Sequence, residues 1–408
     1  MYSLLIHFYA FIVALISPFH RKARLMRFGQ WKTNRLLREE IDRNARYIWF
    51  HASSLGEFEQ GRPMIEKIKA QYPGYKILLT FFSPSGYEVR KDYNGADVIC
   101  YLPFDTPYRV KKFLDLANPA MAVFIKYEFW GNYLRELKKR GIPVYIISAI
   151  FRPDQLFFQW FGAPYRKMLH CFTHLFVQDD RSKELLGQYG IRNVTVCGDT
   201  RFDRVLDVRD RARELPEVEQ FVGGKSLILI AGSTWPQDEE ILIPYFNEHP
   251  EMKLIIAPHE IHREHLMYIE SLLKRPSVRL TDVMLDEDLL EGKDCLIVDC
   301  FGLLSSIYRY GTIAYIGGGF GAGIHNTLEA AVYGIPVLFG PRYRKFREAR
   351  DLIKVGGGFS VASKDEFNDK MDELLTYREV LDAAGGNAGL FVSGNAGVTD
   401  RILKELPL

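Results

Sequence analysis

Two glutamates, Glu57 and Glu128, are the side chains best placed to accept a proton. Glu57 closes the run HASSLGE, and Glu128 lies in the run YEFWGN. Each run follows directly on an apolar, strand-like segment, and the carboxyl ends of parallel strands meet at one edge of a sheet. A carboxylate held at such an edge can act as a general base. The structural alternatives are that Glu57 only complements the first turn of a helix, and that Glu128 only pairs with Lys126 or Arg135.

A glycine-rich stretch, residues 317–341, has the composition of a phosphate-binding loop. Its sequence, GGGFGAGIHNTLEAAVYGIPVLFGP, predicts a loop, a helix that begins at Asn326 and is capped by Glu329, and then a strand. Glycines let backbone N–H groups approach an anion, and a helix N-terminus attracts one. The alternative is that the glycines only turn the chain and Glu329 only caps. The segment from Gly317 to Ala322 matches the dinucleotide pattern weakly and lacks a ribose-binding acid, so no NAD site is expected.

The chain begins with an apolar stretch that is followed by a basic one. Residues 4–19 read LLIHFYAFIVALISPF, which is nearly long enough to cross a bilayer. Residues 21–46 carry a net charge of +6, although the whole chain carries only +2, which gives no indication of nucleic acid as a partner. Basic residues in this place favour the cytoplasmic side and anionic lipid. We therefore expect residues 1–20 to anchor the protein in the inner (cytoplasmic) membrane, with its domains on the cytoplasmic side. The alternatives are a cleaved signal peptide and a buried core helix.

Neither the cysteines nor the histidine cluster predicts a metal site. The five cysteines are scattered and lie mostly in apolar segments, which is typical of reduced core residues. His259, Glu260, His262 and His265 miss the two-histidine spacing of a zinc-binding helix by one residue. We therefore expect no bound metal.

Two series of strand-like segments, each alternating with helix-like ones, position these residues. The alternation predicts two doubly wound parallel sheets, joined near residues 203–222, with a ligand site in the cleft between the two domains. The expected strands are 46–51, 76–81, 97–101, 121–127, 144–148, 174–178 and 194–197, followed by 226–231, 253–257, 295–298, 312–316 and 337–339.

Five motifs resemble those of the 3-deoxy-D-manno-oct-2-ulosonic acid (Kdo) transferases. They are HASSLGE (51–57), YEFWGN (127–132), CGDTRFD (197–203), AGSTWPQDEE (231–240) and the glycine-rich stretch. The resemblance implies an α/β fold of the GT-B type, with two Rossmann-like domains facing across a cleft. It implies a membrane-associated glycosyltransferase of lipopolysaccharide biosynthesis that uses CMP-Kdo as donor and a lipid A precursor as acceptor. The implied parts are a membrane anchor (1–20), an acceptor domain (21–205) and a donor domain (206–408).

The resemblance also implies roles for single residues. Glu57 falls on the family's general base, and Glu128 falls on a glutamate that helps to hold the site. Asn326 and Glu329 fall on contacts to the donor nucleotide. The further donor-binding positions are Ser233, Pro258, His259, Arg263, Gly302 and Gly319, and the acceptor or Kdo contacts are Ser54, Gly56, Ser83 and Arg201.

Several positions depart from the family's pattern. The donor motif Pro-Arg-His is Pro-His-Glu at residues 258–260, so its arginine is missing, and Arg263 or the basic run 342–347 is the expected substitute. Gly-Leu-Leu at residues 302–304 replaces Gly-Glu-Leu, and Gly131 replaces a proline. These changes indicate a divergent branch of the family.

The implied reaction is an inverting transfer that needs neither a metal nor a cofactor besides the donor. Glu57 would take the proton of the acceptor hydroxyl as it attacks the face opposite CMP. Cationic side chains and the glycine-rich loop would stabilise the departing CMP, and Arg201, Arg263 or Arg152 would bind the Kdo carboxylate. Two alternatives stay open: a GT-B transferase or epimerase that uses a UDP-sugar, and a non-catalytic, membrane-tethered binding protein. No pattern in the sequence indicates an oligomeric state.

Overall fold

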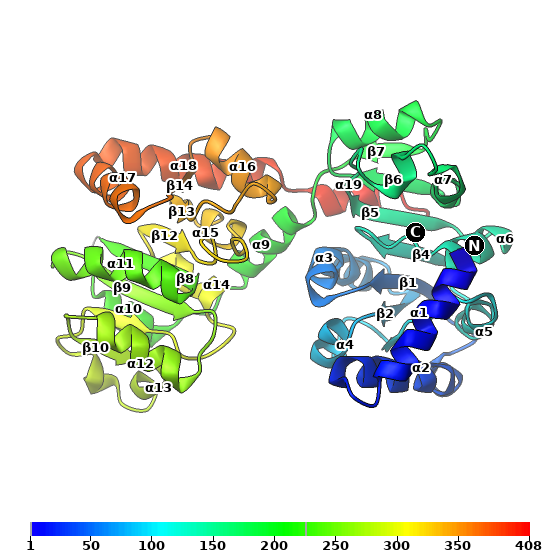
Figure 1. Ribbon diagram of the computed structural model, residues 1–408, viewed down its shortest axis with the longest axis horizontal. Coiled ribbons are helices and arrows are strands. Elements are labelled where there is room, and N and C mark those ends of the chain that lie inside the picture. Colours follow the sequence, from blue (N-terminus) through cyan, green and yellow to red (C-terminus); the bar gives the residue numbers. More distant parts are fainter. Residues whose placement is uncertain (1, 225–226) are drawn as a thin grey trace. The chain divides into compact units, whose positions relative to one another are not determined.

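The computed structural model describes residues 2–224 and 227–408, which form two compact units (Figure 1). Unit 1 runs to Arg204 and also contains Ala396–Leu408, and unit 2 is Val205–Asn395. Each unit contains a seven-stranded sheet in which every recorded strand pairing is parallel. The two doubly wound domains predicted from the alternating pattern are therefore present.

The sheet of unit 1 has the strand order β3-β2-β1-β4-β5-β6-β7. Its strands are β1 (Arg46–Ala52), β2 (Tyr75–Phe81), β3 (Val98–Tyr101), β4 (Met121–Ile125), β5 (Val144–Ala149), β6 (His174–Val177) and β7 (Val194–Val196). The helices of the unit are α1 (Tyr2–Ile16), α2 (Arg21–Glu40), α3 (Leu55–Gln71), α4 (Pro84–Arg90), α5 (Pro107–Ala117), α6 (Gly131–Lys139), α7 (Ala163–Leu169), α8 (Asp180–Gln188) and α19 (Val398–Leu403), with a 3₁₀ turn at Leu156–Phe158.

The sheet of unit 2 has the strand order β10-β11-β9-β8-β12-β13-β14. Its strands are β8 (Ile228–Thr234), β9 (Lys253–Pro258), β10 (Ser277–Arg279), β11 (Cys295–Ile297), β12 (Ile313–Ile316), β13 (Val337–Phe339) and β14 (Gly358–Ser360). Its helices are α10 (Pro216–Val222), α11 (Pro236–Glu248), α12 (Arg263–Leu272), α13 (Leu280–Val283), α14 (Leu304–Ile307), α15 (Leu328–Ala331), α16 (Arg347–Lys354), α17 (Lys364–Thr376) and α18 (Arg378–Gly394), with 3₁₀ turns at Glu287–Leu290 and Tyr308–Tyr310. Helix α9 (Arg201–Asp210) carries the chain from unit 1 into unit 2.

Both faces of the first sheet are buried. Trp49 packs in one apolar layer with Phe113 and Tyr133, whereas its neighbours Ile48 and Phe50 belong to the opposite layer. Successive strand residues point to opposite faces, so a strand covered on both sides must be apolar at every position. This is why β1 reads as a continuous apolar run and could be recognised in the sequence.

Two strands of unit 2, β10 and β14, were not predicted. Each has only three residues, and none of the residues of β10 is fully buried. β10 (Ser-Val-Arg) and β14 (Gly-Phe-Ser) also lack the apolar run by which the equally short β11 and β13 were recognised. The predicted start of β8 at Ser226 lies outside the described residues.

The C-terminal segment lies in unit 1, whereas the sequence placed it in the donor domain that was predicted for residues 206–408. The carboxylate of Asp203 accepts hydrogen bonds from the backbone N–H groups of Gly397 and Thr399 and from the Thr399 hydroxyl, each at 2.6 Å. Val398 and Ile402 are buried in an apolar layer of the first sheet. A contact between residues almost two hundred positions apart leaves no periodic signal, so the sequence did not indicate this return.

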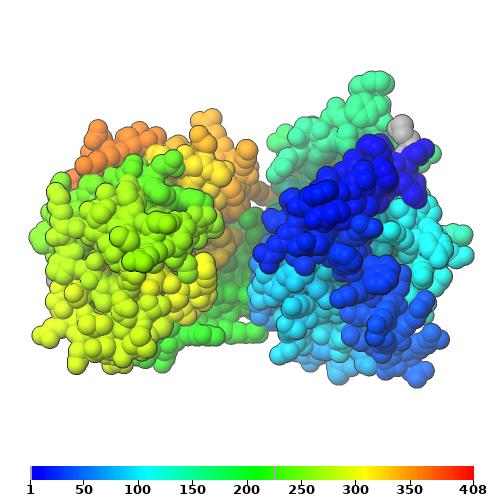
Figure 2. Space-filling model, turned by 60° about the horizontal axis from the view of Figure 1, so that its bottom comes forward, coloured from blue at the N-terminus to red at the C-terminus, as the bar shows by residue number. Residues whose placement is uncertain are grey.

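The first helix runs along the surface of unit 1, where Figure 2 shows it in dark blue. It is an exposed apolar helix, with Leu4 at 74% and Phe8 at 62% exposure, and Val13 is its buried residue. The alternative of a buried core helix therefore does not hold. Among the described residues no single helix has the length and apolar character of a bilayer span; α1 and α2 have them only together, with a bend of 117° between them.

Candidate functional site

The switch point of the first sheet lies between β1 and β4. The chain places β2 and β3 on one side of β1 and places β5, β6 and β7 on the far side of β4. Strands β1 and β4 pair in register, with His51 opposite Phe124, so the loops that follow them emerge side by side. Ligands of doubly wound sheets bind in this place. The loop after β1 leads to Glu57, and the loop after β4 carries Glu128.

Glu57 lies in the first turn of α3, and its carboxylate accepts a hydrogen bond from the backbone N–H of Ser53 at 2.6 Å. Burial, together with repulsion from the negative charge of Glu128, raises the pKa of Glu57 to about 7. The hydrogen bond from Ser53 and the charges of His51 and Lys126 oppose this rise without cancelling it. A carboxyl group that is half protonated near neutral pH has the property that a general base needs.

Glu128 is buried beside His51, whose Nε2 lies 3.0 Å from the Glu128 carboxylate. The indole N–H of Trp130 also points at this pair and donates to Glu128. On the other side of the ring, Nδ1 of His51 lies 3.1 Å from the carbonyl oxygen of Thr80 and 2.9 Å from its hydroxyl. The partners of Glu128 are thus His51 and Trp130, whereas the sequence suggested Lys126 or Arg135 as structural partners. His51 was quoted in its motif but not assigned a role.

The predicted acceptor contacts Ser54, Gly56 and Ser83 lie close to Glu57. Ser54 is the residue that precedes α3, and Gly56 lies in the first turn of that helix. Ser83 caps α4 through its hydroxyl, and its backbone N–H donates to the carbonyl of Ser53 at 2.8 Å. The loops after β1 and β2 are therefore fastened together at the edge where Glu57 lies.

Three cations gather at the ends of β4, β5 and β7. Arg152 and Arg201 both lower the pKa of Tyr127, which burial raises, so both guanidinium groups lie near its hydroxyl. Arg201 is also held by the carboxylate of Asp199 at 2.8 Å. Lys126, immediately after β4, has a left-handed φ of 67°, which costs a non-glycine residue free energy and is often found at functional sites. Their positive charge suits an anionic group, and the binding of the Kdo carboxylate by Arg152 or Arg201 stays a prediction.

Asp105 and Asn132 fasten the N-terminal helix to this edge, a role that the sequence did not indicate. The Asp105 carboxylate accepts hydrogen bonds from the backbone N–H of Asn132 at 3.0 Å and from the hydroxyl of Tyr2 at 2.5 Å. The Tyr2 hydroxyl in turn accepts from the backbone N–H of Gly131 at 3.0 Å. The family's pattern has a proline where this chain has Gly131. A proline has no N–H to donate to the Tyr2 hydroxyl, so the glycine allows α1 to dock in this way. Burial raises the pKa of Asp105 to about 6 although these hydrogen bonds lower it.

The switch point of the second sheet lies between β8 and β12. The predicted donor contact Ser233 lies at the end of β8, where the register shifts and its φ is 54°. The glycine-rich loop follows β12. The backbone of Gly317 packs so closely on Ser233 and Thr234 that an added Cβ would lie 2.3 Å from the Ser233 carbonyl oxygen. The second sheet thus brings Ser233 and the glycine-rich loop together.

Close packing between backbone segments requires glycines in this loop, whereas the sequence suggested that they bind an anion or turn the chain. An added Cβ at Gly319 would lie 2.5 Å from the backbone of Gly340, so a glycine is required by the close approach of two loops. The N–H of Gly318 donates to the Asp238 carboxylate, and those of Gly321 and Gly323 donate to the Gly318 carbonyl. These N–H groups already have partners within the protein.

The helix predicted to begin at Asn326 is a single turn, Leu328–Ala331. Its N-cap is Thr327, whose side chain makes no capping hydrogen bond, so the predicted N-cap at Asn326 is wrong by one residue. Oδ1 of Asn326 still accepts from the N–H of Leu328 at 3.2 Å, and its Nδ2 donates to Glu329 at 2.9 Å. The tight turn at Gly334, where φ is 72°, and the following Pro336 end the helical segment early. A helix of four residues has little macrodipole, which corrects the expectation that its end attracts an anion.

Three aromatic rings stack at the ends of β8, β9 and β12. Trp235 lies 4.9 Å from His259 and nearly parallel to it, and His259 lies 4.5 Å from His325. Burial and the neighbouring His259 both lower the pKa of His325. His259 directly follows Pro258, and both were predicted to bind the donor; Trp235 and His325 were not, although both lie inside the quoted motifs. An exposed face on such a stack suits a planar ring, such as a nucleobase.

The other residues predicted to bind the donor belong to different segments of unit 2. Arg263 is the first residue of α12 and forms no ion pair among the described residues. Gly302, with φ of 87°, follows β11, which is separated from the switch point by β9. In the basic run 342–347, Arg347 pairs with Asp351, and Arg342 donates to the carbonyl of Gly321 in the glycine-rich loop.

The histidines near residue 260 are held by carboxylates. His265 lies 2.9 Å from the buried carboxylate of Glu239, and His262 lies 3.2 Å from Glu260. Within residues 2–224 and 227–408 no group of three or more His, Cys, Asp or Glu is arranged to hold a metal ion.

Comparison with known proteins gives a consistent result. A family model described as "3-Deoxy-D-manno-octulosonic-acid transferase (kdotransferase)" matches residues 22–204. The chain is 28% identical to the 3-deoxy-D-manno-octulosonic acid transferase of Aquifex aeolicus, over 82% of this chain and 87% of that one. It is 27% identical to the Haemophilus influenzae protein of the same name, over 88% and 86% of the two chains.

Among solved structures, UDP-GlcNAc 2-epimerase from Neisseria meningitidis superposes with a TM-score of 0.62. The match covers 88% of this chain and 98% of that one at 15% sequence identity. Identity this low reports the fold alone, which is the GT-B arrangement of two Rossmann-like domains.

Proposed function

The chain belongs to the 3-deoxy-D-manno-octulosonic acid (Kdo) transferases, which are glycosyltransferases, and we propose that it transfers Kdo from CMP-Kdo to a lipid A precursor. The family membership supports the general part of this function, Kdo transfer in biosynthesis of the lipopolysaccharide core. The observation that carries the finer part is the carboxyl group of Glu57, whose pKa is about 7, at the switch point of the first sheet. A base with a pKa near the working pH combines a useful ionised fraction with the strength to take a proton.

Glu57 acts as the general base in this proposal. In its ionised form it takes the proton of the acceptor hydroxyl while the oxygen attacks the anomeric carbon of Kdo on the face opposite CMP. Attack on that face inverts the configuration of the anomeric carbon. The Ser53 N–H, 2.6 Å from the carboxylate, orients Glu57, and the charge of Glu128 keeps it basic.

The donor is proposed to bind unit 2 through its nucleotide. The cytosine ring is a fitting partner for the exposed His259 of the aromatic stack, and Asn326 and Glu329 offer amide and carboxylate groups for hydrogen bonds. The leaving group is a monophosphate, which cationic side chains can stabilise without a divalent ion. Arg263 is the proposed contact for its phosphate, because it starts α12 close to His259 in the chain and has no ion-pair partner among the described residues.

The protein is proposed to act at the cytoplasmic face of the inner membrane. The exposed apolar side chains of α1 are followed in the chain by the basic N-terminal half of α2. Insertion of α1 into the bilayer and attraction of α2 to anionic lipid would both contribute to membrane affinity. Binding of this kind would bring the enzyme to a surface that holds an acylated, phosphorylated acceptor.

The proposed reaction is tested with purified protein, CMP-Kdo and a lipid A precursor, by measuring release of CMP and the mass of the lipid product. Glu57→Gln is expected to lower kcat by about two to four orders of magnitude, since proton transfer contributes that much. Glu66→Gln, in the same helix, is the control that also removes one carboxylate. Unchanged turnover in Glu57→Gln would reject Glu57 as the base, and the product mass gives the number of Kdo units.

Donor identity and metal requirement are tested separately. Calorimetric titration with CMP and with UDP is expected to give tighter binding of CMP, and a preference for UDP would reject the donor assignment. Turnover is expected to persist after addition of EDTA; its loss, and recovery with a divalent cation, would contradict the metal-independent mechanism.

A further inference from the structure

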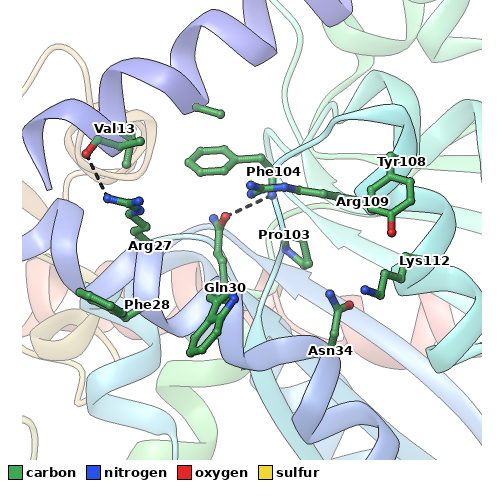
Figure 3. Close-up of a pocket in the computed structure, with 13 residues that line it drawn as sticks. Val13, Arg27, Phe28, Gln30, Asn34, Pro103, Phe104, Tyr108, Arg109 and Lys112 are labelled. Carbon is green, nitrogen blue, oxygen red and sulfur yellow. Dashed lines mark hydrogen bonds between the residues drawn. The ribbon is translucent and has the colours of Figure 1, made fainter.

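A cavity of about 500 Å³ lies in unit 1, between α1, α2 and the segment that leads from β3 into α5. Its walls are largely apolar and include Val13 of α1, Phe28 and Trp31 of α2, and Phe104 of the loop (Figure 3). Trp31 is 79% exposed, so the cavity opens along a surface that already presents apolar side chains. The volume is typical of sites for small molecules and is far below that of a disaccharide carrying several acyl chains.

Two buried polar atoms, each on a residue that lines this cavity, have no hydrogen-bond partner in the described structure. They are Nε2 of Gln30, a side chain that is 4% exposed, and Oδ1 of Asn34. Gln30 is fixed in place, because its Oε1 accepts from the backbone N–H of Phe104 at 3.2 Å. A buried polar atom without a partner costs about 1–3 kcal/mol. Both atoms belong to residues that line the cavity, so a ligand with polar groups would remove this cost.

The charge of the cavity wall is positive. Arg27, Arg109 and Lys112 line it, and none of the described lining residues is acidic. Arg27 is engaged by the Ala14 carbonyl and the Ser17 hydroxyl. Arg109 lies over the ring of Phe104 and Lys112 near that of Tyr108, and neither forms an ion pair with a described acidic residue. Figure 3 shows both cations extending from α5 on the side that faces α2.

We propose that this cavity binds the phosphate and part of one acyl chain of a single anionic phospholipid, with the phosphate at Arg109 and Lys112, the chain against the apolar residues of α1 and α2, and the rest of the lipid outside the cavity. Gln30 Nε2 donates to a phosphate or ester oxygen, and Asn34 Oδ1 accepts from a head-group hydroxyl. The combination of unpaired cations, unpaired polar atoms and apolar walls fits a molecule that has a phosphate joined to a hydrocarbon chain. A bound lipid of this kind would hold α1 on unit 1, independently of which sugar the enzyme transfers.

The test uses the full chain in a neutral detergent with phosphatidylglycerol, and native mass spectrometry counts the lipids retained per protein. One retained phosphatidylglycerol is expected, with little retention of phosphatidylcholine. The double variant Arg109→Ala/Lys112→Ala is expected to weaken retention about tenfold or more, because two charge-assisted contacts are lost. The matched control is Lys111→Ala/Arg181→Ala, which removes the same charge from exposed positions that lie outside both the cavity and the basic half of α2.

Several results would overturn the proposal. Equal loss of lipid in the two double variants would mean that general surface charge attracts it. Equal retention of phosphatidylcholine and phosphatidylglycerol would mean that only the acyl chain is bound. If inorganic phosphate raised the melting temperature of the protein as much as phosphatidylglycerol does, the site would be one for free anions. As a second probe, brominated phosphatidylglycerol is expected to quench the fluorescence of Trp31, judged by difference from Trp31→Phe. Failure of the lipid to quench Trp31 in the folded wild-type chain would also reject the site.

Discussion

Nε2 of His51 lies 3.0 Å from the carboxylate of Glu128, and both side chains are buried. The two residues affect Glu57 in opposite directions, because the charge of Glu128 raises its pKa and that of His51 lowers it. The pair therefore adjusts the proposed base without being part of it.

The first prediction concerns the pH dependence of kcat/KM. In the wild type the acid limb should follow the ionisation of Glu57, with activity rising through a pH of about 7. Glu128→Gln removes the repulsion, so the limb should move to lower pH, although burial still keeps it above the ordinary glutamate range. His51→Gln should move the limb to higher pH. Measured profiles whose limbs coincide in all three proteins would contradict the assignment of the limb to Glu57.

The second prediction is that Glu57→Gln stabilises the fold at alkaline pH. The folded pKa of Glu57 is raised from 4.5 to about 7, so ionising the group above that pH costs the folded state free energy. Below a pH of about 4.5 the carboxyl is protonated in both states and the substitution should change little. Above about pH 7 the variant should gain about 1–3 kcal/mol, measured by urea unfolding across this range. A gain that is the same at low and high pH would indicate a cause other than ionisation.

The third prediction concerns Asp203, which binds the C-terminal segment to unit 1 through Gly397 and Thr399. Asp203→Asn keeps the shape but removes the charge and one acceptor, so it should cost about 1–3 kcal/mol of stability. Hydrogen exchange in residues 396–408 should accelerate most. The control is Asp210→Asn, whose carboxylate is 62% exposed in its ion pair with Arg209 and should contribute less than about 1 kcal/mol.

The fourth prediction concerns the docking of α1. Tyr2→Phe removes the hydroxyl that joins the Asp105 carboxylate to the Gly131 N–H, which leaves both groups without that partner. Exchange of backbone amides in α1 should become about tenfold faster, equivalent to about 1.4 kcal/mol. Tyr9→Phe is the matched control, because the Tyr9 ring packs on Phe104 while its hydroxyl has no partner in the described structure. Equal effects of the two substitutions would mean that the hydroxyl of Tyr2 does not hold the helix.

The sequence by itself determined the architecture of each unit and the position of the chemical groups along the chain. Apolar runs such as residues 47–50 are continuous because both faces of the sheet are covered, and this local property can be recognised without a structure. The motifs that contain Glu57 and Glu128 follow directly on such apolar runs, so both residues could be assigned to one edge of a parallel sheet. The proposed site residues remain predictions about function, but their place at strand ends follows from the pattern.

The tertiary structure decided which strand ends are neighbours and which groups already have partners. The pairing of β1 with β4 and of β8 with β12 places Glu57 near Glu128 and the glycine-rich loop against Ser233. Other long-range contacts give several N–H groups of that loop partners within the protein, join the C-terminal segment to Asp203, and leave Nε2 of Gln30, a cavity-lining residue, without a partner in the described structure. These outcomes depend on contacts between residues far apart in the chain, and such contacts leave no period in the sequence, because only neighbours within a helix turn or a strand repeat at fixed spacing.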